Sequence, residues 1–191
     1  MGLKVTTGIS NKHVHLSDAD LARLFGAGHK LTVKKNLRQA GQYAAEEMVD
    51  VVGPKGVLKG IRILGPTRKE SQVELAQTDA RTIGLTLPVR ESGVLDNTPG
   101  VKLIGPAGEL NLARGAIIAL RHIHLSPAEA AEAGVRDKDR VTVNTFGSRP
   151  LIFEDVLIRV NADFINEFHV DTDEGNAAGI TNGDIVEIIG K

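Results

Sequence analysis

The segment His13-Val14-His15-Leu16-Ser17 returns later in the chain as His122-Ile123-His124-Leu125-Ser126, and this duplication decides how the whole sequence is interpreted. Each copy carries two histidines at positions i and i+2. Because these positions point to the same face of a β-strand, each copy can present two imidazoles side by side. The sequence therefore predicts two related halves, each with a strand that can grip a metal ion.

A helix start follows each histidine pair. The segment SPAE at 126–129 has a serine N-cap, a proline at the first helical position and a glutamate three residues after the cap. Gly134 is a suitable end for this helix. Ser17 begins a weaker counterpart, in which Leu21 and Leu24 follow at helical spacing. Both halves are thus expected to run from a histidine strand into a short capped helix.

The repeat has a second part, which supplies a third ligand to each pair. The segment QVEL at 72–75 aligns with EFHV at 167–170, and a glycine and an aliphatic residue follow at matching distances. The alignment makes Glu74 equivalent to His169, and both residue types ligate zinc. One ion is therefore predicted on His13, His15 and Glu74, and the other on His122, His124 and His169. A single histidine pair is common by chance, but two copies with a matched third ligand favour metal binding; His29 is expected to be an ordinary loop residue.

The composition narrows the class of protein. The 191 residues are 41% apolar but only 3% aromatic, without tryptophan, so the core must consist of Val, Ile, Leu and Ala. The net charge of −1 and the lack of a basic tract argue against nucleic acid as a partner. The sequence has no cysteine, no apolar run near the ~20 residues that span a bilayer and no visible signal peptide. A cytoplasmic protein without membrane or nucleic-acid partners is expected.

Short β-type segments punctuated by Gly and Pro run through the chain and predict a mainly β fold with short helices. Strands are expected at 49–52, 61–64, 101–104, 141–143, 157–160 and 185–189, with turns at 53–56 and 105–108. We predict two small β-barrel domains, each capped by a helix and related by the internal repeat. The polar segment 95–100 places the domains at 1–97 and 98–191, and strands may be exchanged between the halves.

The ligand set indicates reactive rather than structural metal sites. Three protein ligands per ion leave open positions for water or substrate, and two ions can clamp an oxyanion such as phosphate. Arg68 lies between the strand predicted at 61–64 and Glu74, so its guanidinium is expected near the first ion. A guanidinium suits bidentate phosphate binding, although an arginine in such a turn can also be a solvated residue.

The sequence resembles the phosphate propanoyltransferase family, the PduL-type phosphotransacylases. The resemblance covers nearly the whole chain and rests on long segments: SNKHVHLS at 10–17, QAGQYAAEE at 39–47, ILGP at 63–66, TDAR at 78–81, PVRESG at 88–93 and HVDTDEGNA at 169–177. One departure is Ala40, where the family pattern has proline. This difference alters a turn and touches no predicted ligand.

The resemblance implies an enzyme that transfers a short acyl group, acetyl or propanoyl, between coenzyme A and inorganic phosphate, in propanediol or acetate metabolism. It also implies two divalent ions of the zinc type on the six ligands, two barrel domains with the active site and CoA pocket at their interface, and a homodimer. The family's phosphate-binding arginine matches Arg68. Its CoA contacts match Ser10, Lys35, Arg62, Leu64 and Asn176. The two cations among them suit the phosphates of CoA, but either one alone can be an ordinary surface residue.

The expected mechanism is direct displacement without an acyl-enzyme. Phosphate held by Arg68 and the metals attacks the thioester carbonyl, and Ser92 is a candidate donor to the oxyanion. Ser10 or Ser92 as nucleophile stays open.

Two other functions compete with this one. A dimetal hydrolase of a phosphate ester or thioester could use the same site to activate water. A metal-binding barrel without activity would bind ions and turn over no acyl-CoA. Family members that enter bacterial microcompartments carry an N-terminal extension, whereas nine residues precede Ser10 here, so a free cytoplasmic enzyme is expected; a trimmed chain would look the same.

Overall fold

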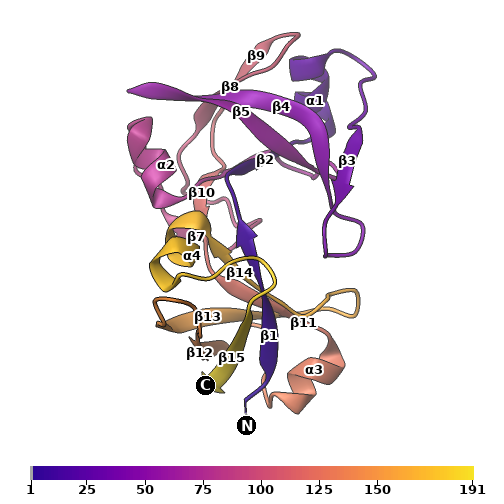
Figure 1. The fold of residues 1–191 in the computed structure, drawn as a ribbon. Coiled ribbons are helices and arrows are strands. Elements are labelled where there is room, and N and C mark those ends of the chain that lie inside the picture. The colour runs from indigo at the N-terminus through magenta and orange to yellow at the C-terminus, as the bar shows by residue number, and fades with distance from the viewer. Residues whose placement is uncertain (1) are drawn as a thin grey trace. The chain divides into compact units, whose positions relative to one another are not determined.

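The computed structural model describes residues 2–191, over which the chain forms fifteen strands and four short helices (Figure 1). Contacts divide the chain into two compact units. One unit is contiguous and spans Lys12–Ala119. The other is interrupted, because it joins the N-terminal residues through Asn11 to Leu120–Lys191.

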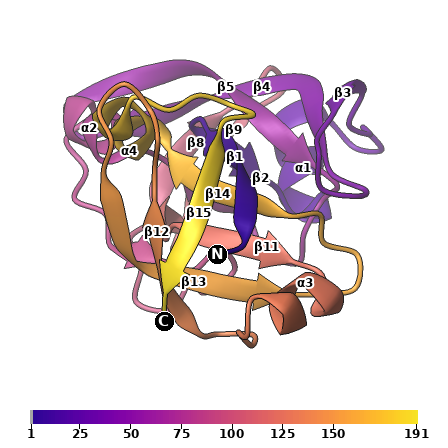
Figure 2. The same cartoon turned by 60° about the horizontal axis from the view of Figure 1, so that its bottom comes forward.

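The interrupted unit is a closed six-stranded barrel. Its strands follow the order β1 (Lys4–Ser10), β14 (Glu167–Asp171), β11 (His122–Leu125), β13 (Ile152–Val160), β12 (Arg140–Asn144) and β15 (Ile185–Gly190). The barrel closes where β1 pairs antiparallel with β15, and Figure 2 shows these two strands side by side. Two helices complete the unit: α3 (Pro127–Glu132) packs against β11, and α4 (Thr172–Ala178) packs against β14 and β1.

The contiguous unit is a nine-stranded sheet that curls into a half-barrel. Its main path runs through β7 (Val89–Arg90), β10 (Ala116–Ala119), β6 (Gln72–Glu74), β2 (His13–His15), β5 (Gly56–Gly65), β4 (Tyr43–Gly53), β8 (Val101–Ile104) and β9 (Glu109–Leu112). The remaining strand, β3 (Val33–Asn36), pairs with β4. Helix α1 (Asp18–Phe25) packs against β9, and α2 (Gln77–Thr82) follows β6.

Each unit has its own aliphatic core. Branched residues such as Val14, Leu16 and Ile63 are fully buried in the contiguous unit, and Val5 and Ile123 in the interrupted unit. Only Phe168 adds a fully buried aromatic ring among the described residues. The predicted core of Val, Ile, Leu and Ala is therefore confirmed, as is the mainly β fold of two barrel-like units with short helices.

The internal repeat is visible in the strand pairing. In the contiguous unit, β2 pairs parallel with β5 and antiparallel with β6. In the interrupted unit, β11 pairs in the same way with β13 and β14. A serine caps the helix after each histidine strand: Ser17 accepts a hydrogen bond from the amide of Asp20, and Ser126 forms a capping box with Glu129. The predicted helix starts and the strands expected from the turn signals are all present.

The two compact units are grouped differently from the domains predicted at 1–97 and 98–191. Residues 101–119 stay in the contiguous unit, because β8 forms a ladder with β4 and β10 forms one with β6. Residues 4–10 join the interrupted unit, because β1 pairs with β14 and β15. The exchange of strands between halves that the sequence allowed thus involves the first strand of the chain. None of the four helices over residues 2–191 is long and apolar enough to cross a membrane.

Candidate active site

The first predicted triad comes together on neighbouring strands of the contiguous unit. The register of β2 and β6 sets His13 opposite Glu74, and the period of two brings His15 to the same face. His13 Nε2 lies 3.4 Å from Glu74 Oε2, and His15 Nε2 lies 3.9 Å from Glu74 Oε1. All three side chains are buried, and their ligand atoms lie within 4.8 Å of one another.

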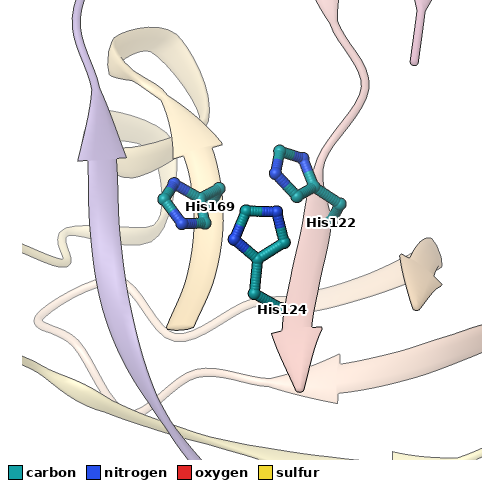
Figure 3. A group of neighbouring side chains, drawn as sticks. All are labelled: His122, His124 and His169. Atoms are coloured by element: carbon teal, nitrogen blue, oxygen red, sulfur yellow. The ribbon is translucent and has the colours of Figure 1, made fainter. Parts of the chain in front are cut away.

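The second predicted triad forms on the equivalent strands of the interrupted unit. The register of β11 and β14 sets His122 opposite His169, with His124 two residues along (Figure 3). The ring centroids lie 4.8 Å apart for His122 and His124, and 4.9 Å apart for each of these rings and His169. One ligand atom from each residue falls within 4.8 Å of the others.

Backbone carbonyls fix the protonation of one histidine in each triad. His15 Nδ1 lies 3.2 Å from the carbonyl of Leu64, and His122 Nδ1 lies 2.8 Å from the carbonyl of Leu120. A carbonyl can only accept, so in each ring the hydrogen sits on Nδ1. This leaves Nε2 with its lone pair directed into the triad, the arrangement that metal-binding histidines commonly use.

The buried histidines are held in the neutral form that binds metal. Burial, together with the neighbouring His13, lowers the pKa of His15 to about 3. Burial also lowers the pKa of His124 to about 2, with help from His122 and His169. Both rings are therefore neutral at physiological pH and need to lose no proton to act as ligands.

Glu74 is the carboxylate of the first triad. Burial alone would raise its pKa, but the adjacent His13 and His15 and a hydrogen bond from Ser92 reverse the effect, and the pKa lies well below the ordinary value. Glu74 is thus ionised and supplies a negative charge beside the two imidazoles.

The residues of both triads fit a divalent cation. In the second triad, both ring nitrogens of His124 are buried without a hydrogen-bond partner among residues 2–191, and the ring stacks on Phe164 at 4.0 Å. Buried polar atoms without partners are costly, and a bound cation would satisfy one of them. Imidazole and carboxylate donors without thiolate suit zinc and several other divalent ions.

A hydrogen-bond network joins Arg68 to the first triad through Ser92. Ser92 Oγ donates to Glu74 Oε1 at 2.8 Å and accepts from Arg68 Nη1 at 3.1 Å. Gln72 Nε2 also donates to Ser92 Oγ, at 2.9 Å, and to Glu74 Oε1. The hydroxyl therefore uses its single hydrogen and both lone pairs within this network. This arrangement gives Ser92 the role of orienting Arg68 and Glu74.

The backbone of Arg68 is anchored beside the first histidine strand. Its amide donates to the carbonyl of Leu16 at 2.8 Å, and the residue forms an isolated β-bridge with Ser17. The guanidinium is only partly buried. The structure thus places this cation beside the first triad, as its position between the strand and Glu74 predicts.

The five candidate CoA contacts fall into one group in each unit. Lys35 on β3 faces Ala44 of β4, and Ala44 faces Leu64 of β5. Lys35 and Leu64 therefore lie in one row across the three strands. Arg62 lies two residues before Leu64 on the same face, where its guanidinium donates to the carbonyl of Ala45.

In the interrupted unit, Ser10 ends β1 opposite Asp171, and the exposed Asn176 lies on α4, which begins immediately after Asp171. The remaining histidine, His29, is exposed; it stacks on Phe25 and lies 2.9 Å from a carboxylate oxygen of Glu47. His29 takes no part in either triad.

Two residues of the site escaped the sequence interpretation. Gln72 and Glu167 each lie two positions before the third ligand of a triad, and so share its face of the strand. The period of two could have found both.

The chain is similar to known proteins over most of its length. A family model described as phosphate propanoyltransferase matches residues 6–181. A phosphate propanoyltransferase of Thermotoga maritima is 56% identical over 97% of this chain and 89% of its own length. Proteins of the same name from Citrobacter koseri and Salmonella typhimurium are each 52% identical, over 94% and 93% of this chain and 86% and 85% of their own.

The chain therefore belongs to the phosphate propanoyltransferase family. The predictions of this family and of an acyltransferase enzyme are confirmed. The comparisons give no support to the alternative of a dimetal hydrolase.

Proposed function

We propose that this protein transfers a short acyl group, acetyl or propanoyl, between coenzyme A and inorganic phosphate. The observation that carries the proposal is the buried triad of His13, His15 and Glu74, which Ser92 joins directly to the guanidinium of Arg68. A cation-binding triad beside an arginine suits a doubly or triply charged oxyanion such as phosphate. The names of the relatives support the same substrates.

The proposal includes two divalent ions, with zinc as the best fit to the donor set. The first would be held by His13, His15 and Glu74, and the second by the triad His122, His124 and His169. When bound, such ions polarise phosphate and carbonyl oxygens and stabilise the charge that develops on them. The neutral imidazoles and the ionised Glu74 are already in the protonation states that this binding requires.

The chain's own residues position the reactants for direct displacement. Arg68 holds phosphate as a bidentate partner, and Ser92 keeps the guanidinium beside Glu74. A phosphate oxygen attacks the thioester carbonyl, a new C–O bond forms, the C–S bond breaks and CoA leaves as the thiolate. No thiol can accept the acyl group, because the chain has no cysteine. Holding both reactants in place supplies much of the rate enhancement.

Recognition of CoA is proposed for the two groups of residues that the resemblance indicates. Lys35 and Arg62 lie on one face of the β3–β4–β5 sheet with Leu64, and their charges suit the phosphates of CoA. Ser10 and Asn176 lie near the shared end of β1 and β14. A homodimer is proposed on the resemblance alone, and light scattering on the purified protein would test it.

The test is CoA release from acetyl-CoA and propanoyl-CoA with and without phosphate. We expect release that requires phosphate and that is lost in both His13→Ala and His122→Ala, because the proposal draws on both triads. His29→Ala is the matched control, since this exposed histidine lies outside both triads and should keep full activity. Equal release without phosphate would replace the proposal by a hydrolase. Metal binding without any release would leave a metal-binding barrel.

A further inference from the structure

Each triad is part of a larger square of four side chains on one face of an antiparallel strand pair. In the contiguous unit, His13 faces Glu74 and His15 faces Gln72. In the interrupted unit, His122 faces His169 and His124 faces Glu167. The fourth corner is thus occupied by Gln72 in one square and by Glu167 in the other.

Each of the two squares carries one carboxylate, but at a different corner. The first has its carboxylate, Glu74, at the third corner and the neutral Gln72 at the fourth, where the amide donates to that carboxylate. The second has an imidazole, His169, at the third corner and the carboxylate of Glu167 at the fourth. Both squares therefore hold two strand histidines, one acidic side chain and one side chain that is not acidic.

The carboxylate of Glu167 lies beside one ligand of the second triad, His169. Its Oε2 is 3.0 Å from His169 Nε2, but the approach lacks hydrogen-bond geometry. Two donors on one tetrahedral zinc ion are about 3.4 Å apart, given zinc–nitrogen bonds of about 2.1 Å. A separation of 3.0 Å is normal for an N–H···O hydrogen bond, so the orientation, and not the distance, distinguishes this approach from that of a donor and its acceptor.

The fold makes room for this acidic side chain in the barrel. Glu167 is only 8% exposed, so its carboxylate lies inside the barrel rather than in solvent. A Cβ atom on Gly8 of the neighbouring β1 would lie 2.7 Å from Glu167 Oε1. The absence of a side chain at residue 8 therefore leaves the space in which the carboxylate lies.

We propose that Glu167 is a positioning residue of the second metal site: its carboxylate, 3.0 Å from His169 Nε2, supplies the site's negative charge beside that ligand. Three imidazoles carry no negative charge to offset that of a dication, whereas Glu167 places a carboxylate beside them as Glu74 does in the first site. The inference rests on the proposed function, because it requires the second triad to bind a metal.

The experiment isolates the second site in a protein that carries His13→Ala and His15→Ala. Zinc affinity is measured by competition with a chromogenic chelator, before and after adding Glu167→Gln, which keeps the shape of the side chain and removes its charge. We expect the affinity to fall 10–100-fold, the usual effect of losing a group that supports a metal ligand. Glu167→Asp should restore part of it. Glu154→Gln, the same change at an exposed position of β13, is the matched control.

A second variant tests the same site without a change of charge. Gly8→Ala should displace the carboxylate and also weaken zinc binding, while circular dichroism of the metal-free protein shows that the barrel remains folded. Zinc affinity within twofold of the parent in Glu167→Gln would overturn the inference and leave the proposed function intact. A parent protein that binds no zinc would overturn both, because the second triad would then hold no metal.

Discussion

Ser92→Ala distinguishes an orienting role for the hydroxyl from a direct role at the reacting carbonyl. The substitution removes one donor to Glu74 and one acceptor for Arg68, both of them hydrogen bonds to charged groups. Such bonds contribute about 1.5–3 kcal/mol each. Gln72 still donates to Glu74, and water can take the place of the hydroxyl at the guanidinium. We therefore expect the transition state to lose about 2 kcal/mol of stabilisation.

A loss of this size corresponds to a fall of about 30-fold in kcat/KM. We expect part of it as a higher KM for phosphate, since Arg68 loses its orientation, together with weaker zinc binding at the first triad. The assay follows free CoA thiol with a thiol-reactive chromogen while phosphate is varied, and the protein itself contributes no thiol signal because it lacks cysteine. Ser92→Thr, which keeps the hydroxyl, should retain most of the activity.

The orienting role would be refuted by a different pattern in the same experiment. A collapse of kcat with an unchanged KM for phosphate and unchanged zinc affinity would mean that Ser92 acts on the transition state, as the oxyanion donor considered from the sequence does.

Three further predictions follow from the same geometry. Arg68→Lys should raise the KM for phosphate at least tenfold with little change in zinc content, because an ammonium cannot form the bidentate contact; equal KM values would exclude the contact. After zinc is removed, the free energy of unfolding measured with urea should be highest above about pH 6.5 and should fall below that pH by about 1.4 kcal/mol per pH unit for each of His15 and His124. The reason is that their pKa values of about 3 and about 2 in the folded protein lie below the pKa of about 6.5 in the unfolded chain, so the unfolded chain takes up the protons. A free energy of unfolding that does not change from pH 7 to pH 5 would contradict the burial of these rings. A fragment spanning Lys12–Ala119 should fold alone and bind one zinc ion per chain, as measured by circular dichroism and elemental analysis, and an unfolded fragment would show that this unit depends on the rest of the protein.

The side chains that come together in the two triads could be predicted from the sequence because their grouping depends on local periodicity. The period of two places His13 and His15 on one face whatever the rest of the chain does, and the repeat then identifies Glu74 and His169 as third ligands. The same applies to the helix that Ser126 begins, since its capping box lies within four residues.

What the sequence did not predict depends on contacts between distant residues. Nothing in the local pattern of residues 4–10 shows that β1 will pair with β14 and β15. The period of two places Gln72 and Glu167 on the faces of the triads, but which histidine each of them faces appears only when the register of the paired strands is known. The need for glycine at residue 8 likewise becomes visible only in the structure, where the carboxylate of Glu167 lies beside it.

The pairing of β1 with β14 and β15 also has a consequence for how the protein is made. On the ribosome, β1 is synthesised early, but its two partner strands follow only after Lys12–Ala119 and most of the barrel have emerged. The contiguous unit can fold during translation, whereas the barrel must wait with one unpaired strand exposed. An unpaired strand edge is prone to pair with other chains. Synthesis of the last strands is therefore the step at which this protein most needs protection from aggregation.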